Sequence, residues 1–184
     1  MFSSQQIIMH QEARDFIASV KSEYPQFFVG RKVLEVGSLD INGSVREFFE
    51  KCDYTGIDLG EGPGVDTVAL VHEYEYPDSY DVVISAEMLE HDRHWRKSLA
   101  AMYCNVKVGG LLVVSCAGPT RLKHGVVNRK PGDSPFTTDY YRNISLSDFE
   151  DVLPPTKFLR FVLALSANHK DLYFFGIKGG DGAT

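Results

Sequence analysis

An acid, a glycine turn and a second acid follow one another early in the chain, in an order typical of sites for nucleotide-like ligands. The apolar run 33–36 contains one carboxylate, Glu35, and ends at Gly37. Glycine there allows a sharp turn and a close approach of the backbone to a ligand. The next apolar run, 54–59, carries Asp58 near its end. In a parallel sheet a carboxylate at that position can accept hydrogen bonds from ribose hydroxyls.

An ordinary strand–helix–strand unit, in which Asp58 only caps a turn, is the alternative interpretation. Glu35 argues against it, because a carboxylate inside a buried strand is costly unless something pairs with it. The two acids and the glycine between them therefore predict a cofactor site.

The elements that position these residues alternate along the chain. Helical spacing of apolar residues predicts helices, and short apolar runs rich in β-branched residues predict strands. The predicted helices cover 7–24, 45–51 and 91–106, and the predicted strands cover 33–36, 54–59, 65–69, 81–85 and 111–116. This alternation predicts a parallel sheet with helices on both faces.

The end of the chain breaks the alternation. Two predicted strands, 158–165 and 172–177, are linked by only 166–171, which is too short for a crossover helix. We therefore expect an α/β fold: a Rossmann-like, doubly wound, mostly parallel seven-stranded sheet with helices on both faces and a C-terminal antiparallel hairpin. The stretch 117–143, rich in Gly, Pro and charged residues, is expected to be a functional loop.

Length and composition limit the kinds of protein. The 184 residues allow one domain with a full core, and a hydrophobic content of 43% indicates a globular chain. The net charge is −6 and the basic clusters, 93–97 and 121–130, are small, which disfavours nucleic acid as a partner.

The expected location is the cytoplasm. No apolar stretch is long enough to cross a bilayer, and the N-terminus lacks the basic start and apolar core of a signal peptide. Cys52, Cys104 and Cys116 lie far apart without metal-ligand spacing. We expect reduced thiols and no metal site.

Four motifs, in family order, resemble those of the class I S-adenosylmethionine-dependent methyltransferases, most closely the type 11 branch. The first is Val-Leu-Glu-Val-Gly-Ser at 33–38 and the second is Tyr-Thr-Gly-Ile-Asp at 54–58. The third is Ser-x-Glu-x-Leu-Glu-His at 85–91, after a strand that begins at Tyr80. The fourth is Lys-Val-Gly-Gly-Leu-Leu at 107–112, similar to the family's Lys-Pro-Gly-Gly run.

The resemblance implies one methyltransferase domain, 1–184, that binds S-adenosylmethionine. Its parts are an N-terminal helical segment, 1–29, a cofactor-binding half, 30–117, and an acceptor loop with the terminal hairpin, 118–184. The implied contacts run from the methionine part at Gly37, through the ribose at Asp58, to the methyl-bearing side at the end of the fourth strand. The implied cofactor-binding residues are Glu35, Gly37, Ser38, Leu39, Asn42, Asp58, Leu59, Val71, His72, Ser85, Ala86 and Glu87.

The chain departs from the family pattern at two positions. Leu39 replaces a glycine of the family's glycine-rich turn, and Leu70 replaces an acid that commonly precedes the adenine contact. His72 is our candidate substitute for that acid. Glu87 and Glu90 are placed to favour a cationic cofactor through space, although acids are also preferred at helix starts.

No single catalytic base follows from the sequence. The weak candidates are His91, His124 and Tyr140, with Tyr141 beside the last. His91 follows the fourth strand, and its alternative role is at the start of a helix. His124 lies among basic residues that suit either an anionic acceptor or a solvated loop.

The expected function is methylation of a small-molecule acceptor on oxygen or nitrogen. A cofactor-binding scaffold or regulatory partner without turnover is the alternative. A nicotinamide enzyme is disfavoured, because it requires Gly-x-Gly-x-x-Gly and Gly37 is followed by no such spacing. A homodimer through Phe27, Phe28 and the terminal hairpin is a further possibility.

Overall fold

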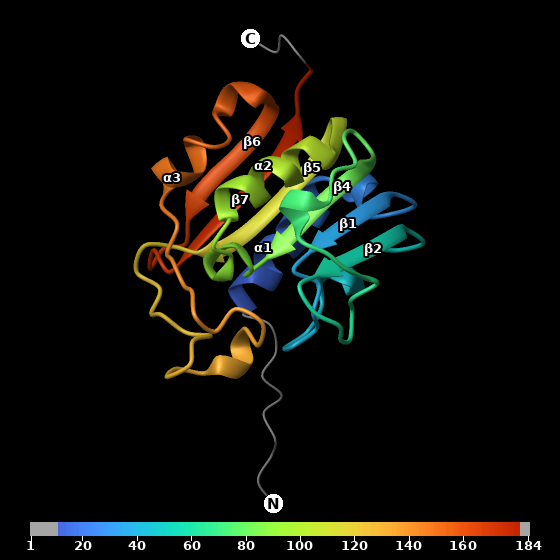
Figure 1. Cartoon of the computed structure of the whole chain (residues 1–184). Coiled ribbons are helices and arrows are strands. Elements are labelled where there is room, and N and C mark those ends of the chain that lie inside the picture. Colours follow the sequence, from blue (N-terminus) through green and yellow to red (C-terminus); the bar gives the residue numbers. More distant parts are fainter. Residues whose placement is uncertain (1–10, 181–184) are drawn as a thin grey trace, which may run out of the picture.

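The computed structural model describes residues 11–180, and its seven strands form one sheet (Figure 1). The strand order is β3-β2-β1-β4-β5-β7-β6, and β7 runs antiparallel to the other six strands. The strands are β1 Lys32–Val36, β2 Asp53–Asp58, β3 Thr67–Val68, β4 Tyr80–Ala86, β5 Val106–Ala117, β6 Phe158–Leu165 and β7 Asp171–Lys178. The predicted fold class, including the antiparallel hairpin, is confirmed.

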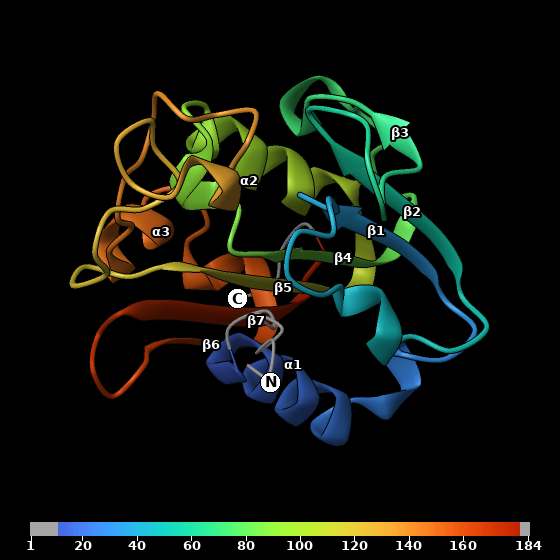
Figure 2. The same cartoon turned by 90° about the horizontal axis from the view of Figure 1, so that it is seen from below.

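The helices cover both faces of this sheet. In Figure 2, α1 lies on one face and α2 and α3 lie on the other. Their bounds are α1 Gln11–Glu23, α2 Trp95–Asn105 and α3 Leu146–Glu150. The short 3-10 turns are η1 Pro25–Phe27, η2 Val45–Phe48, η3 Val71–Glu73, η4 Leu89–His91, η5 Pro131–Asp133 and η6 Pro155–Lys157. Residues 7–10 of the first predicted helix lie outside the described residues.

The core consists of two apolar layers, one on each side of the sheet. Val82 and Ile84 of β4 pack with Ile17 of α1 on one face. Val83, between them in sequence, packs with Leu99 of α2 on the other face. Because successive side chains of a strand point to opposite faces, a strand covered on both sides must be apolar throughout. This is why the central strands were recognisable as short apolar runs.

The helix predicted for 45–51 is wrong, since the segment forms only the 3-10 turn η2. Ser44 starts the turn by accepting the Arg46 N–H on its hydroxyl, but Phe49 is already extended, with φ −103° and ψ 136°. Phe49 stacks on the buried Phe28 at a centroid distance of 4.8 Å. So short a helix is marginal by itself, and this tertiary contact decides the backbone.

The helix predicted to begin at His91 begins at Trp95 instead. Residues Leu89–His91 form the separate turn η4, and Asp92 is extended. The Asp92 carboxylate accepts the His94 N–H at 2.7 Å and the Ser98 hydroxyl, which holds the start of α2. The break leaves η4 directly beyond the carboxyl end of β4.

Two strands also differ in length from their predictions. The third strand covers only Thr67–Val68 instead of 65–69, and the fifth runs from Val106 to Ala117 instead of 111–116.

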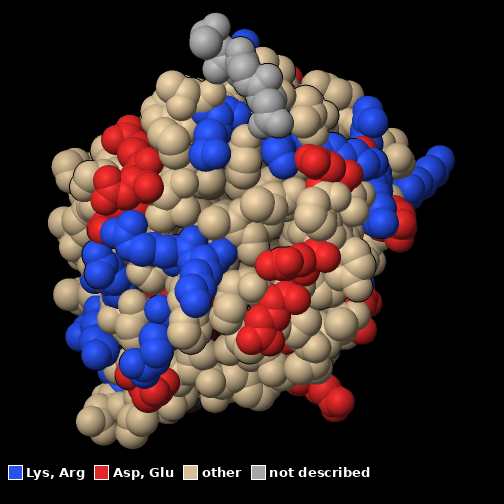
Figure 3. Space-filling view, turned by 45° about the horizontal axis from the view of Figure 1, so that its top comes forward, with Lys and Arg blue, Asp and Glu red and all other residues tan. Residues whose placement is uncertain are grey.

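Phe28 cannot contribute to the proposed dimer surface, because its side chain is fully buried in the core. The edge strand β6 has exposed apolar side chains, including Leu159 and Val162. On the face seen in Figure 3, Lys and Arg lie in groups with Asp and Glu nearby, and they form no continuous positive track there.

No helix among residues 11–180 is long and apolar enough to span a bilayer.

Replacing Leu99 tests the packing of α2 on the sheet. Leu99 is fully buried, so Leu99→Ala should lower the free energy of unfolding by about 2–5 kcal/mol. Leu159→Ala removes the same atoms from a residue that is 66% exposed and should change stability by less than about 0.5 kcal/mol. Urea unfolding measures both, and similar losses in the two variants would contradict the described packing.

Candidate functional site

A crevice of about 420 Å³ opens at the carboxyl ends of β1, β2 and β4. Part of the long loop 117–143, from Asp133 to Tyr140, forms its other wall. The volume is in the range of small-molecule sites. Eleven of the twelve predicted cofactor residues line it: Glu35, Gly37, Ser38, Leu39, Asn42, Asp58, Leu59, Val71, His72, Ala86 and Glu87.

Gly37 makes the turn that begins the crevice. Its φ is +79°, and a Cβ atom there would lie 2.6 Å from the Cβ and Cγ of Met88. The N–H groups of Gly37 and Ser38 both donate to the Ile57 carbonyl, at 2.9 and 3.1 Å. The turn is therefore joined to β2 and pressed against the residue that follows Glu87. Only glycine satisfies both conditions without strain.

Leu39, which replaces a family glycine, is accommodated by the glycine loop after β2. A Cβ at Gly62 would lie 2.3 Å from the Leu39 side chain, so the absent side chain leaves room for it. The Asp40 N–H donates to the Pro63 carbonyl at 2.8 Å, which links the two loops directly. The larger side chain at Leu39 is thus compensated by the absence of a side chain at Gly62.

Asp58 lies at the end of β2 and joins that strand to the first turn. Its carboxylate accepts the Leu39 N–H at 3.1 Å on one oxygen and the Leu59 N–H at 2.7 Å on the other. Burial raises the pKa of Asp58, and hydrogen bonds from the N–H groups of Leu39, Leu59 and Gly60 act in the opposite direction. The carboxylate lines the crevice, where it is also available to hydroxyl donors.

Glu35 is buried in β1 and has a partner. The Tyr54 hydroxyl donates to its carboxylate at 2.9 Å. Burial raises the pKa of Glu35 to about 7, against the opposing effects of the Tyr54 hydrogen bond and the positive charge of Arg46. This buried carboxylate therefore has a structural partner as well as a place in the crevice wall.

Among the site residues named from the sequence, the structure does not place Ser85, Glu90, His124 and Tyr141 on the crevice. Ser85 follows Val83 on the face of β4 that packs toward α2, so its side chain is buried inside the fold. His124 lies behind His91, and their rings meet edge to face at 5.0 Å. Tyr140 does line the crevice, with the Arg93 guanidinium 5.2 Å from its ring.

The sequence interpretation missed Met88 and the side chains of the long loop that line the crevice. The Phe136 ring lies where a Cβ at Gly60 would be, so the loop reaches the end of β2. The composition of 117–143 indicated a functional loop, but no motif selects the residues that face inward. The loop residues concerned are Asp133, Ser134, Pro135, Phe136, Thr137 and Asp139.

Arg121 and two carboxylates form an ion-pair group beside the crevice. The guanidinium contacts Glu87 at 2.6 Å and Asp171 at 2.7 Å, and all three side chains are at most 15% exposed. Glu87 also accepts the Ser115 hydroxyl at 2.9 Å and has a φ of +57°. The charge of Arg121 is therefore already neutralised by these two partners. Arg121 ties the loop to β4 and β7.

The candidate bases differ in their electrostatics. Burial, followed by the nearby His124, lowers the pKa of His91 to about 4. Burial also lowers the pKa of His124. His91 is therefore neutral at pH 7, and it is the candidate imidazole that lines the crevice. A neutral imidazole can accept a proton, although the lowered pKa makes His91 a weak base.

Several solved structures with a similar fold are S-adenosylmethionine-dependent methyltransferases. One is phosphoethanolamine N-methyltransferase 2 of Haemonchus contortus with S-adenosylhomocysteine (TM-score 0.64, 17% identity, 91% of this chain and 53% of that one). A second is the 1,6-didemethyltoxoflavin N1-methyltransferase of Burkholderia thailandensis (TM-score 0.62, 16% identity, 91% and 78%). A third comes from Archaeoglobus fulgidus (TM-score 0.60, 15% identity, 90% and 94%).

These similarities concern the fold, because the sequence identities are low. No protein-family model and no curated protein sequence matches the chain. The chain spans about half of the length of the Haemonchus enzyme. The fold is that of the class I S-adenosylmethionine-dependent methyltransferases, as the sequence motifs predicted.

Gly37→Ala tests the first turn. We expect a loss of stability of at least about 1–2 kcal/mol from the left-handed backbone alone, with a further cost from the contact with Met88. Gly132→Ala is the matched control, because a Cβ there meets nothing within 4 Å. Thermal unfolding compares the two variants. Equal stabilities would mean that the Gly37 turn is not as described.

Arg121→Ala tests the ion-pair group. The change removes the cation between two largely buried carboxylates, and the expected loss is roughly 3–5 kcal/mol in the free energy of unfolding. Arg129→Ala, in an exposed part of the same loop, should change it by less than about 0.5 kcal/mol. A small effect at Arg121, measured by urea unfolding, would argue against the pairing.

Proposed function

We propose that this chain is an S-adenosylmethionine-dependent methyltransferase with a small-molecule acceptor. The observation that carries the proposal is the position of Asp58, which ends β2, holds the Leu39 amide and lines the crevice. In sheets of this kind, ligands bind outside the carboxyl ends of the strands, and an acid at this place recognises ribose. We take 1–184 as a single methyltransferase domain.

The residues around the crevice fit such a cofactor. Gly37 lacks a side chain where the backbone turns toward the crevice, and the Asp58 carboxylate is available to a sugar diol. Beyond Asp58, Leu59 and Val71 supply an apolar wall for a planar base, and His72 lies beside them. The His72 Nδ1 is already 3.4 Å from the Ser98 hydroxyl, so its role as a substitute for the missing acid remains a prediction.

S-adenosylmethionine, when bound, supplies a methyl group on a positively charged sulfur. This chain has to bind it, hold an acceptor in line and exclude water. Ala86, Glu87 and Met88 line the crevice at the end of β4, where the reacting end of the ligand is expected. The loop side chains from Asp133 to Tyr140 cover the opposite wall and are our candidates for acceptor contacts.

Oxygen and nitrogen acceptors place different demands on these residues. A hydroxyl acceptor must lose a proton, and His91 and Tyr140 are the candidate bases on the crevice. His124 can act only through His91, because it does not line the crevice. An amine that is neutral at the working pH needs no base before the attack.

A cofactor-binding scaffold without turnover is the alternative function. It is separated from the enzyme by incubation with labelled S-adenosylmethionine and a panel of small hydroxyl and amine acceptors. Release of S-adenosylhomocysteine that depends on an acceptor supports the enzyme. Tight binding without product across the panel supports the scaffold.

Asp58→Ala should weaken binding of S-adenosylhomocysteine by about 1.5–3 kcal/mol, because it removes a charged hydrogen-bond acceptor. This corresponds to roughly 10-fold to 150-fold in Kd, measured by isothermal titration calorimetry. Asp58→Asn, which keeps one acceptor oxygen, separates loss of the charge from loss of the bonds to the Leu39 and Leu59 amides. Folding should be largely preserved, as circular dichroism will show.

Asp53→Ala is the control, since Asp53 is exposed at the other end of the same strand. Its affinity should equal that of the wild type. Unchanged affinity in Asp58→Ala would place the ligand elsewhere.

A further inference from the structure

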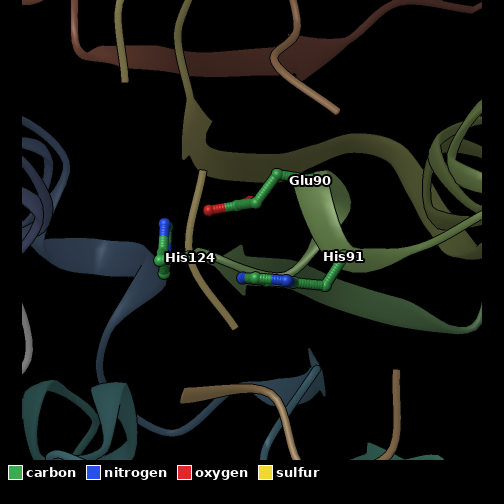
Figure 4. A group of neighbouring side chains, drawn as sticks. All are labelled: Glu90, His91 and His124. Atoms are coloured by element: carbon green, nitrogen blue, oxygen red, sulfur yellow. The ribbon is translucent and has the colours of Figure 1, made fainter. Parts of the chain in front are cut away.

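Three side chains that can bind a metal ion converge beside the crevice. Glu90 and His91 come from the turn η4, and His124 comes from the long loop (Figure 4). One potential ligand atom from each lies within 4.8 Å of the other two. The residues are far apart in the sequence, so the loop must fold back onto η4 to bring them together.

Glu90 is buried, and no side chain among the described residues forms a hydrogen bond or an ion pair with it. Its exposure is 0%, and neither carboxylate oxygen forms a hydrogen bond with good geometry. Burial and the negative charge of Glu87 raise the pKa of Glu90, against the effects of the nearby Glu90 and Ala117 backbone amides and of the Arg121 charge. The Arg121 guanidinium itself is engaged by Glu87 and Asp171. Ionising a carboxylic acid in this buried position is costly unless a cation joins it.

Each of the two histidines has a ring nitrogen that is available to bind a metal ion. His91 is 6% exposed, and its Nδ1 has no hydrogen-bond partner. The Nδ1 of His124 lies 3.1 Å from the Leu122 carbonyl oxygen, which suits a donated N–H. That tautomer leaves the Nε2 lone pair of His124 free to bind a metal. Histidine ligands of metal ions commonly donate their other N–H to a carbonyl in this manner.

We propose that Glu90, His91 and His124 form a binding site for one divalent transition-metal ion. Two imidazoles and one carboxylate suit Zn²⁺, Mn²⁺ or Fe²⁺, whereas Mg²⁺ and Ca²⁺ prefer oxygen ligands. The expectation that the chain lacks a metal site rested on its cysteines, and it did not consider residues that only the folded loop brings together.

The observed spacing requires a small contraction when the ion binds. Ligand atoms about 2.1 Å from a tetrahedral centre lie about 3.4 Å from one another. The present spread reaches 4.8 Å, so the ligands must move closer. His124 belongs to a loop with little regular structure, and it can supply this movement. The ion would then fasten the loop to η4.

Three protein ligands leave at least one coordination position for water. His91 also lines the crevice, so the ion would lie at the crevice wall. If the proposed function holds, an acceptor hydroxyl could replace that water, and the ion would then make it easier for the hydroxyl to lose its proton, which favours hydroxyl acceptors over amines. The metal site itself does not depend on the proposed function.

Metal titration of the tag-free, metal-stripped full chain tests the site. Calorimetry with Zn²⁺, and electron paramagnetic resonance with Mn²⁺, should show one saturable site with micromolar affinity for at least one ion. His124→Ala should weaken that binding at least tenfold, and Glu90→Gln should do the same with little change in shape. If Glu90→Gln does not fold, His124→Ala in the loop remains decisive.

His94→Ala is the matched control, because the His72 and His94 rings lie 4.8 Å apart and form the competing histidine pair. Its metal affinity should equal that of the wild type. No saturable binding by the wild type, or equal affinity in His124→Ala, would overturn the proposal. Binding of S-adenosylhomocysteine to the metal-free chain is measured separately, so failure of the metal site and failure of the proposed function are distinguishable.

Discussion

Parallel pairing of β1 with both β2 and β4 is the constraint on which the crevice depends. The pairing aligns Val36 with Ile57, and Glu35 with Ile84, so the three strands end at one edge of the sheet. The turn at Gly37 then bonds to the Ile57 carbonyl and presses against Met88. A parallel sheet covered on both faces leaves this edge as the place where polar side chains can gather around a ligand.

Three buried or largely buried carboxylates near this edge of the sheet differ in the partners that they have. Glu35 has the Tyr54 hydroxyl, and Glu87 has Arg121 and Ser115. Glu90 is buried more completely than either, yet no side chain in residues 11–180 forms a hydrogen bond or an ion pair with it. Since the fold satisfies the first two carboxylates, the third stands out, and the two imidazoles beside it point to a cation rather than to a packing defect.

The fold was largely predictable because the composition of each central strand indicates which of its faces are buried. Val82, Val83 and Ile84 are apolar in succession, which indicates a strand covered on both faces. The helix predicted around Phe49 failed for a related reason. The helical spacing of apolar residues predicts which side chains are buried on one face of a helix. The stacking of Phe49 on Phe28 buries the same side chain with an extended backbone instead.

The candidate site was predictable only where local motifs define it. Gly37 and Asp58 are set by the strand ends that carry them, and the structure places both on the crevice. Ser85 belongs to a matching motif as well, but the alternation along β4 turns its side chain into the core. A motif fixes the position of a residue along a strand, and the pleat together with the neighbouring layers decides which way it faces.

The amino-acid sequence by itself determined the strands, the left-handed turn at Gly37 and the antiparallel ending, because these depend on residues close together in the chain. Tertiary structure alone decided that Arg121 neutralises Glu87 and Asp171, and that His124 meets Glu90 and His91. Those contacts join the long loop to distant elements. Their geometry depends on how the whole loop packs against η4 and β7, for which no local pattern of residues carries a signal.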